Sequence, residues 1–173
     1  FVTRVQVKTT PQSSYNRRLH GWRKSLERAL YLATRRGYLA MATSMAGAFV
    51  RSGPWVDYPD MQMSFRPMTF TTTASGEVNI DPYDAVSASV YRVRPSSRGE
   101  VLLRSPDPMQ PPAFIPNYLQ HPEDIQAMLG GLRTLRQIMA TDPIASRVIS
   151  EIVPGTQRTS DEQLIDYMRS DGQ

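Results

Sequence analysis

The sequence predicts an α+β fold in which a mostly antiparallel β-sheet is flanked by helices. Segments that alternate with period two occur early and in the middle of the 173-residue chain. Segments with an apolar stripe at helical spacing lie between and after them. The two kinds of segment do not follow the regular rhythm of a parallel βαβ fold. The length suits one domain with a hydrophobic core.

The first predicted strand covers residues 1–8. Phe1, Val5 and Val7 lie on one face of it, whereas the polar residues fall on the other. This alternation is typical of a half-buried strand. Proline and small polar residues from Pro11 onward end the pattern.

Three further segments predict strands. Residues 61–66 alternate between apolar and polar side chains up to Pro67, which cannot continue a central strand. Residues 85–94 are rich in Val, Ser and Ala, and residues 100–104 follow a short turn. The segments between these strands and helices, including the proline-rich residues 105–122, are predicted to be loops.

Residues 22–36 predict the first helix. The helix is amphipathic, and the basic residues of its last turn, followed by Gly37, indicate where it ends. We expect its apolar stripe to belong to the core. The stripe comprises Trp22, Leu26, Ala29, Leu30 and Ala33.

A longer helix is predicted to begin at Pro122, because proline suits the first position of a helix. An apolar stripe continues from there to Met139. We expect His121, just before the helix, to be a cap or a surface residue. Gly130 and Gly131 inside the pattern predict close packing against a neighbouring element.

The last predicted helix follows Thr159. This residue and Glu162 have the spacing of a capping box, which marks the start of a helix. We expect the helix to end near Met168.

The basic residues are concentrated near the N-terminus. The chain carries a formal net charge of +4, and seven basic residues lie between Arg17 and Arg36. Such a stripe is one signature of nucleic-acid binding. No aromatic platform or groove-reading motif accompanies it, so we expect no nucleic-acid partner. The stripe is interpreted as a solvated helix face or as a surface that meets acidic groups of another domain.

Residue content excludes several classes of site. The chain has no cysteine, which rules out disulfides and thiolate chemistry. Neither His20 nor His121 has a carboxylate at a metal-binding spacing, so no metal site is expected. The sequence also lacks G-x-G-x-x-G, the phosphate-binding loop and G-x-S-x-G. These patterns alone therefore predict no catalytic residue in the chain.

No apolar run reaches the roughly 18 residues that a transmembrane helix requires. The apolar residues 39–50 are too few to span a bilayer. We therefore expect no transmembrane segment and a cytoplasmic location, with peripheral membrane association as the alternative. The absence of cysteine fits a reducing compartment.

Residues 91–119, YRVRPSSRGEVLLRSPDPMQPPAFIPNYL, carry an ordered series of motifs. P-x-S-R-G begins at Pro95, S-x-D-P-x-x-x-P at Ser105 and P-N-Y-L at Pro116, and P-E-D opens the helix at Pro122. The series resembles the C-terminal substrate-domain segment of the glucose–methanol–choline (GMC) flavoenzymes.

Two other segments strengthen the resemblance. Residues 41–52, MATSMAGAFVRS, resemble the family segment that precedes a strand beginning P-D-L, here P-D-M at Pro59. The helix after P-E-D carries the family pattern G-x-R-x-x-R through Gly131, Arg133 and Arg136. The resemblance thus runs in the right order through nearly all of the chain.

The resemblance implies that residues 1–173 are a substrate-binding domain excised from a longer parent. In this family the FAD-binding domain, with its glycine-rich turn, lies upstream. The catalytic histidine lies in an H-P-x-G-T segment, expected shortly beyond Gln173. Neither segment occurs in residues 1–173, and the chain starts inside a predicted strand, so we expect it to be trimmed at both junctions with the FAD-binding domain. It would then have no catalytic residue, bind no cofactor by itself and be inactive alone.

The implied parent oxidises a primary alcohol. Its histidine takes the hydroxyl proton, and hydride passes to flavin N5. The expected partners of this domain are a small-molecule alcohol and the FAD-binding domain, and self-association through the exposed domain interface is expected as well. The alternative is a stand-alone binding module that has lost catalysis.

Five residues are predicted to bind substrate by this resemblance. Met45 aligns near a glutamate that binds trimethylammonium in choline-oxidising members, so a cationic substrate is not expected. Arg94 aligns with a pocket histidine and Tyr91 with an aromatic that contacts sugar, although both cannot face the flavin from one regular strand. Ser64 and Phe65 on the neighbouring strand complete the set, with ordinary sheet packing as their alternative role.

Overall fold

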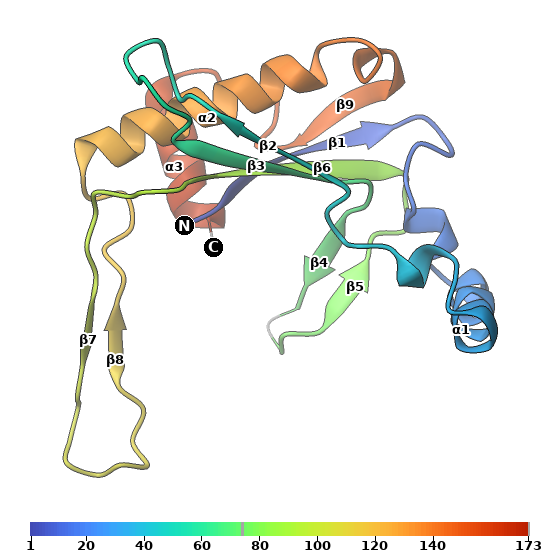
Figure 1. The fold of residues 1–173 in the computed structure, drawn as a ribbon, viewed down its shortest axis with the longest axis horizontal. Coiled ribbons are helices and arrows are strands. Elements are labelled where there is room, and N and C mark those ends of the chain that lie inside the picture. The colour runs from blue at the N-terminus through green and yellow to red at the C-terminus, as the bar shows by residue number, and fades with distance from the viewer. Residues whose placement is uncertain (74, 173) are drawn as a thin grey trace.

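The computed structural model describes residues 1–73 and 75–172 and has the predicted α+β architecture (Figure 1). Its centre is a five-stranded sheet in the order β2-β3-β6-β1-β9, in which every neighbouring pair is antiparallel. The strands are β1 (Thr3–Thr9), β2 (Ala46–Val50), β3 (Met61–Arg66), β6 (Ala85–Arg92) and β9 (Val148–Val153).

Two ribbons and the helices make up the rest of the described chain. The ribbons pair β4 (Phe70–Thr72) with β5 (Val78–Ile80) and β7 (Glu100–Leu102) with β8 (Ala113–Ile115). The α-helices are α1 (Trp22–Thr34), α2 (Pro122–Met139) and α3 (Asp161–Asp171). Short 3-10 turns are η1 (Asn16–Arg18), η2 (Tyr38–Ala40) and η3 (Ala145–Arg147).

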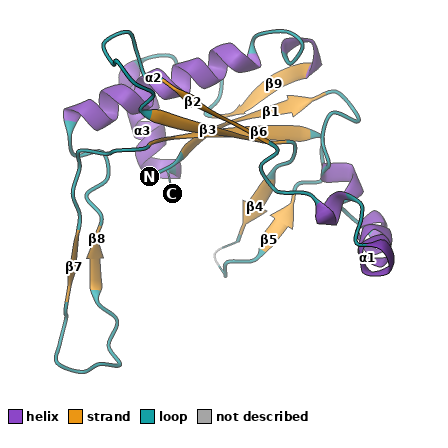
Figure 2. Cartoon of the chain, viewed as in Figure 1, coloured by secondary structure: helices purple, strands orange, loops and turns teal. Residues whose placement is uncertain are grey.

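The helical layer covers one face of the sheet. In Figure 1, α2 and α3 pack on that face, whereas α1 and both ribbons extend from the opposite side. Figure 2 shows that loops connect the two ribbons to the sheet. The molecule is therefore a two-layer body with three appendages on the side away from α2.

Alternation along the strands decides which side chains join the core. Val5 and Val7 of β1 point toward the helices, and Ala88 and Val86 lie opposite them on β6. Met63 of β3 continues this layer. The helices complete the core with the buried residues Met128, Leu132, Leu135, Leu164, Tyr167 and Met168.

A pair of glycines lets α2 approach the sheet closely, as the sequence predicts. A Cβ on Gly131 would lie 2.7 Å from Cε of Met61 and 2.9 Å from Cγ2 of Val90. A Cβ on Gly130 would collide with the backbone oxygen of Ser52. Neither position has room for a side chain unless a neighbour moves.

The arginines of the G-x-R-x-x-R motif fasten α2 to its neighbours. Arg136 makes a two-pronged ion pair with Glu151 of β9, with Nη2–Oε1 at 2.7 Å and Nε–Oε2 at 3.1 Å. Arg133 pairs with Asp161 in the first turn of α3. At the start of α2, the His121 side chain accepts a hydrogen bond from a backbone N–H of the first turn, which confirms its predicted capping role.

The α1 stripe predicted to lie in the core is exposed, so that prediction is wrong. The described part of the chain buries none of the α1 residues; Trp22 is 71% exposed and Leu26 58%. The helix also ends at Thr34, two residues early, where Arg35 caps it with a left-handed φ of 56°. Helical spacing shows which residues share a face, but it does not show whether another element covers that face.

Several strands were missed by the sequence analysis. These are β2, β9 and the ribbon strands β4, β5 and β8, of which β8 lies inside the predicted loop 105–122. The edge strand β2 does not alternate, and a strand of three residues is too short to show a period. The strands predicted over 85–94 and 100–104 each end two residues early, at Arg92 and Leu102.

The capping box of α3 lies one residue beyond its predicted place. The Ser160 side chain accepts from the N–H of Gln163, and the Gln163 side chain accepts from the N–H of Ser160. The pair Thr159 and Glu162 has the same spacing, so sequence alone cannot choose between the two. The helix continues to Asp171.

A buried carboxylate ties the β7–β8 arm (residues 93–120) to α2. Asp124 is 3% exposed, accepts hydrogen bonds from the N–H groups of Ser96 (2.8 Å) and Ser97 (2.7 Å), and pairs with Arg92 of β6. Burial raises the pKa of Asp124, but the hydrogen bonds from Ser97, Ser96 and Arg92 lower it more, to about 2 from 3.8. One side chain therefore joins β6, the arm and α2.

Gly130→Ala is expected to lower the free energy of unfolding by about 1–3 kcal/mol, because the new methyl group meets a backbone carbonyl that cannot rotate away. Gly131→Ala is expected to cost less. Its methyl group meets side chains that are able to shift, and alanine gains about 1 kcal/mol of helix propensity over glycine. Urea denaturation of both variants measures the difference, and a smaller loss for Gly130→Ala would contradict the packing described.

Asp124→Asn is expected to cost about 2 kcal/mol at neutral pH, because the pKa of Asp124 is lower in the folded state than in the unfolded chain. This contribution is present above the unfolded pKa of 3.8 and is lost as the pH falls toward 2. The stability gap between wild type and variant should therefore close over that range in urea titrations. Asp107→Asn, at an exposed position on the arm, is the control. A gap that does not change with pH would refute the assignment.

Candidate functional site

The sheet face opposite α2, which we call the open face, carries a band of mostly polar side chains. In an antiparallel pair, residues directly opposite one another project to the same side. The register therefore gathers alternate residues of three strands on this face. They are Gly47 and Phe49 of β2, Gln62, Ser64 and Arg66 of β3, and Ser87, Ser89 and Tyr91 of β6.

The middle row of the open face, which we call the floor, consists of the small residues Gly47, Ser64 and Ser89. Gly47 lies opposite Ser64, and Ser64 lies opposite Ser89. The two serine hydroxyls are hydrogen-bonded at 2.8 Å. No side chain in this row extends beyond an Oγ atom, and because Ser89 is only 6% exposed, Ser64 is the more accessible of the two hydroxyls.

Larger side chains stand on both sides of this floor. Phe49 and Tyr91 belong to the adjacent row, and Phe49 is 63% exposed. On the other side, Arg66 lies opposite Ser87, and its guanidinium is 5.9 Å from the centre of the Phe70 ring. The buried Nε of Arg66 has no acceptor among the described residues. The face thus combines a polar floor, an aromatic side and an unsatisfied donor.

The open face offers hydrogen-bonding and aromatic side chains from β2, β3 and β6. The side chains that the described β2, β3 and β6 place there include neither histidine nor carboxylate. No cluster of three metal-ligating side chains occurs in residues 1–73 and 75–172. The same residues contain no glycine-rich turn between a strand and a helix that could hold a dinucleotide pyrophosphate.

Ser64 and Tyr91 lie on the open face, and Met45 lies beside its edge strand. Ser64 is part of the floor, and Tyr91 lies in the adjacent row. Met45 directly precedes β2 and is 45% exposed. Its backbone N–H donates to the carbonyl oxygen of residue 65 at 2.9 Å, which is one residue out of the β2–β3 register, so the alternation of β2 does not extend to Met45.

Phe65 and Arg94 lie elsewhere. The Phe65 side chain packs against the core, on the side of the sheet opposite to its neighbour Ser64. Arg94 follows the end of β6, and its guanidinium lies 5.8 Å from the ring centre of Tyr58. The strand alternation that set Tyr91 against Arg94 does not apply, because the ladder ends at residue 92.

Sequence reasoning missed six residues of the open face, which are Gly47, Phe49, Gln62, Arg66, Ser87 and Ser89. Gln62, Ser87 and Ser89 were visible as the polar half of two alternating segments, but only the register joins those halves into one surface. Phe49 was not predicted, because β2 shows no alternation of apolar and polar residues.

Comparison with known proteins gives a family for this chain. Residues 95–173 match the family model described as GMC oxidoreductase. The chain belongs to the GMC oxidoreductase family. The matched region contains the arm, α2, β9 and α3, which are the elements joined by Asp124 and the motif arginines.

Curated relatives extend the likeness upstream. The chain is 34% identical over 140 residues to an alcohol dehydrogenase [acceptor] of Pseudomonas putida, covering 81% of this chain and 25% of the relative. It is 34% identical over 141 residues to an oxygen-dependent choline dehydrogenase of Ectopseudomonas mendocina, covering 82% of this chain and 24% of the relative. The chain thus spans about a quarter of the length of these relatives.

Among solved structures, a formate oxidase of Aspergillus oryzae superposes with a TM-score of 0.81 at 21% identity. The superposition covers 98% of this chain and 34% of the oxidase, whose description refers to its FAD. At this identity the likeness establishes the fold, and it confirms the predicted fold class. No helix in the described residues is long and apolar enough to cross a bilayer.

Proposed function

We propose that residues 1–173 form the substrate-binding domain of an FAD-dependent alcohol dehydrogenase or oxidase whose FAD-binding domain lies outside this chain. The observation that carries the proposal is the open face, where the side chains of β2, β3 and β6 offer hydrogen-bonding groups and include neither histidine nor carboxylate. A face of this kind becomes useful when a second domain brings the cofactor and the base to it.

Each part of the open face has a role in this proposal. The hydroxyl of Ser64, which is hydrogen-bonded to the buried Ser89, would hydrogen-bond a neutral alcohol or the edge of the cofactor ring. Tyr91 and Phe49 provide an apolar side for the carbon chain of the substrate. Met45 is uncharged and cannot form an ion pair with a cation, so an uncharged alcohol is favoured over choline as the substrate. Arg94, in the loop after β6, would contact the substrate at the periphery of the site. Phe65 would contribute by packing in the core and not by touching the substrate.

Bound FAD would supply the hydride acceptor for the oxidation of a primary alcohol. This domain would cover the ring and the substrate from one side, excluding water and orienting the reacting carbon. The alternative, a stand-alone binding module without catalysis, predicts no flavin in the intact parent protein.

The test is expression of the chain with its natural flanking sequence. The purified parent is expected to show the visible spectrum of oxidised flavin, which bleaches when a primary alcohol is added without oxygen. An intact parent that carries no flavin and is inert toward alcohols would refute the proposal.

Met45→Glu in that parent is expected to shift kcat/KM toward choline, relative to an uncharged alcohol, by about tenfold, because a carboxylate attracts the cation. Met109→Glu places the same charge at an 85% exposed position on the arm and should leave the ratio unchanged. Equal shifts in both variants would remove Met45 from the substrate surface.

We also propose that the isolated chain self-associates through the open face. In the parent the FAD-binding domain would cover this face, whereas in the isolated chain the apolar side chain of Phe49 is left exposed. Light scattering is expected to show a mass that rises with concentration. Phe49→Ser should reduce this rise, whereas Leu32→Ser, at a 69% exposed position on α1, should not. A monomer at high concentration would contradict the proposal.

A further inference from the structure

The N-terminal third of the chain is almost devoid of negative charge. Glu27 is the single acidic residue within residues 1–56. Seven basic residues lie between Arg17 and Arg36, on α1 and beside it. The positive charge of the protein is therefore focused on one appendage, which lies at the end of the molecule away from the β7–β8 arm (Figure 1).

The charges on this appendage are not neutralised locally. Glu27 accepts a hydrogen bond from the N–H of Tyr38 at 3.4 Å, so it is turned toward η2. Arg17 pairs with Asp84 at 2.7 Å. The other six basic residues have no carboxylate partner among the described residues: Arg18, Arg23, Lys24, Arg28, Arg35 and Arg36.

The same helix displays an apolar stripe. Trp22, Leu26 and Leu30 follow one another at a spacing of four residues and are 71%, 58% and 44% exposed. Lys24 and Arg28 lie on the opposite side of the helix by the same spacing. A short amphipathic helix with a tryptophan and leucines on one face and cations on the other is typical of helices that lie in a membrane interface.

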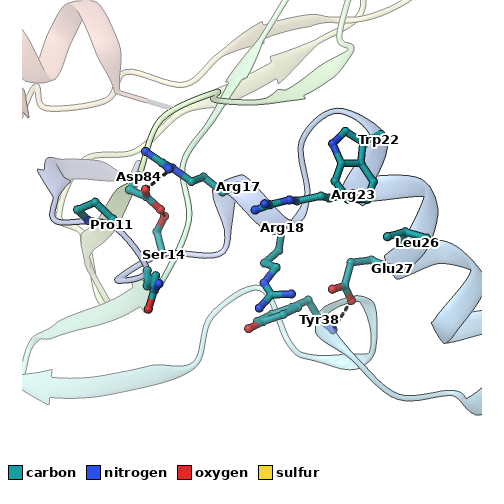
Figure 3. A pocket seen from close by; sticks show the side chains of 11 residues that line it. Pro11, Ser14, Arg17, Arg18, Trp22, Arg23, Leu26, Glu27, Tyr38 and Asp84 are labelled. Atoms are coloured by element: carbon teal, nitrogen blue, oxygen red, sulfur yellow. Dashed lines mark hydrogen bonds and ion pairs between the residues drawn. The ribbon is translucent and has the colours of Figure 1, made fainter.

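A cleft beside α1 adds to the chemistry of this surface. It has a volume of about 720 Å³ and lies between α1 and the loop that follows β1. Figure 3 shows Arg17, Arg18 and Arg23 around it, with Trp22 and Leu26 on the α1 side. Two of these cations lie against aromatic rings, since Arg18 is 5.9 Å from the ring centre of Tyr38 and Arg23 is 5.6 Å from that of Trp22. The cleft therefore presents guanidinium groups next to an apolar wall.

We propose that α1 and this cleft dock the protein on a bilayer rich in anionic phospholipid. The Trp22–Leu26–Leu30 stripe enters the boundary between head groups and acyl chains. Arg18 and Arg23 meet lipid phosphates, because a guanidinium matches phosphate geometry. The cations on the far side of α1 add long-range attraction to the negative surface.

An anionic bilayer fits these observations better than other occupants do. A second copy of α1 would bring like charges together. Nucleic acid would leave the leucine stripe unused, because it is bound through its phosphates and its bases. The proposal does not depend on the oxidation chemistry above, since it involves neither the open face nor a flavin.

The test uses the 173-residue chain carrying Trp55→Phe, which leaves Trp22 as the single tryptophan. Extruded vesicles of phosphatidylcholine, with or without phosphatidylglycerol, are mixed with the protein and floated on a density gradient. Binding is expected with the anionic vesicles and should weaken as sodium chloride screens the charge. The Trp22 emission should shift to the blue and be quenched by brominated acyl chains.

Two pairs of variants locate the binding surface. Leu26→Ser with Leu30→Ser, and separately Arg18→Glu with Arg23→Glu, are each expected to weaken partition into anionic vesicles by about tenfold or more. Leu103→Ser with Met109→Ser and Arg104→Glu with Arg169→Glu make the same chemical changes away from α1. All altered side chains are exposed, so thermal melts should be unchanged.

The outcomes are distinct from those for the proposed function. Equal binding to neutral and anionic vesicles, or equal losses in the α1 variants and their controls, would overturn the membrane proposal. So would an α1 variant that abolishes self-association without lipid, because α1 would then be an interface between copies. Salt-sensitive binding to DNA that exceeds binding to the vesicles would also overturn it. Presence or absence of flavin in the parent protein leaves the inference untouched.

Discussion

The close approach of α2 to the sheet determines much of this structure. At Gly131 side chains of the sheet fill the space a Cβ would need, and at Gly130 the backbone of Ser52, in the loop after β2, fills it. Core residues on both elements meet as a consequence, because a packed interior tolerates few voids. Helix and sheet thus form one unit in which one sheet face is covered. The opposite face is free of that constraint, and there the strands carry serine, glutamine and glycine where the covered face carries valine and methionine.

The division of the sheet into two chemically different faces connects fold and function. Because alternate residues of a strand point to opposite sides, β3 and β6 each contribute side chains to both the core and the open face. Ser64 and Phe65 are adjacent in the chain but belong to different faces. A substitution at Phe65 therefore alters the core, whereas one at Ser64 alters the open face. The membership of the chain in the GMC oxidoreductase family gives the open face its proposed task.

The appendages use charge in two contrasting ways. At the base of the arm, Asp124 is buried and fully engaged by Arg92 and two backbone N–H groups, so its charge fixes geometry. On α1 the arginines are exposed and mostly without carboxylate partners in the described chain, so their charge acts outward. Paired buried charges specify structure, whereas exposed charges of one sign shape encounters with other molecules.

The sequence by itself determined the fold class, the helix at Pro122 with its cap, the close packing at Gly130 and Gly131, and the family. These follow from local patterns, because periodicity, capping residues and motifs are properties of neighbouring residues. Tertiary structure decided which alternating halves join into the open face, since register links residues far apart in the chain. It also decided that Phe65 faces the core and that the α1 stripe is exposed. Burial depends on what packs against a face, and no periodicity within one segment contains that information.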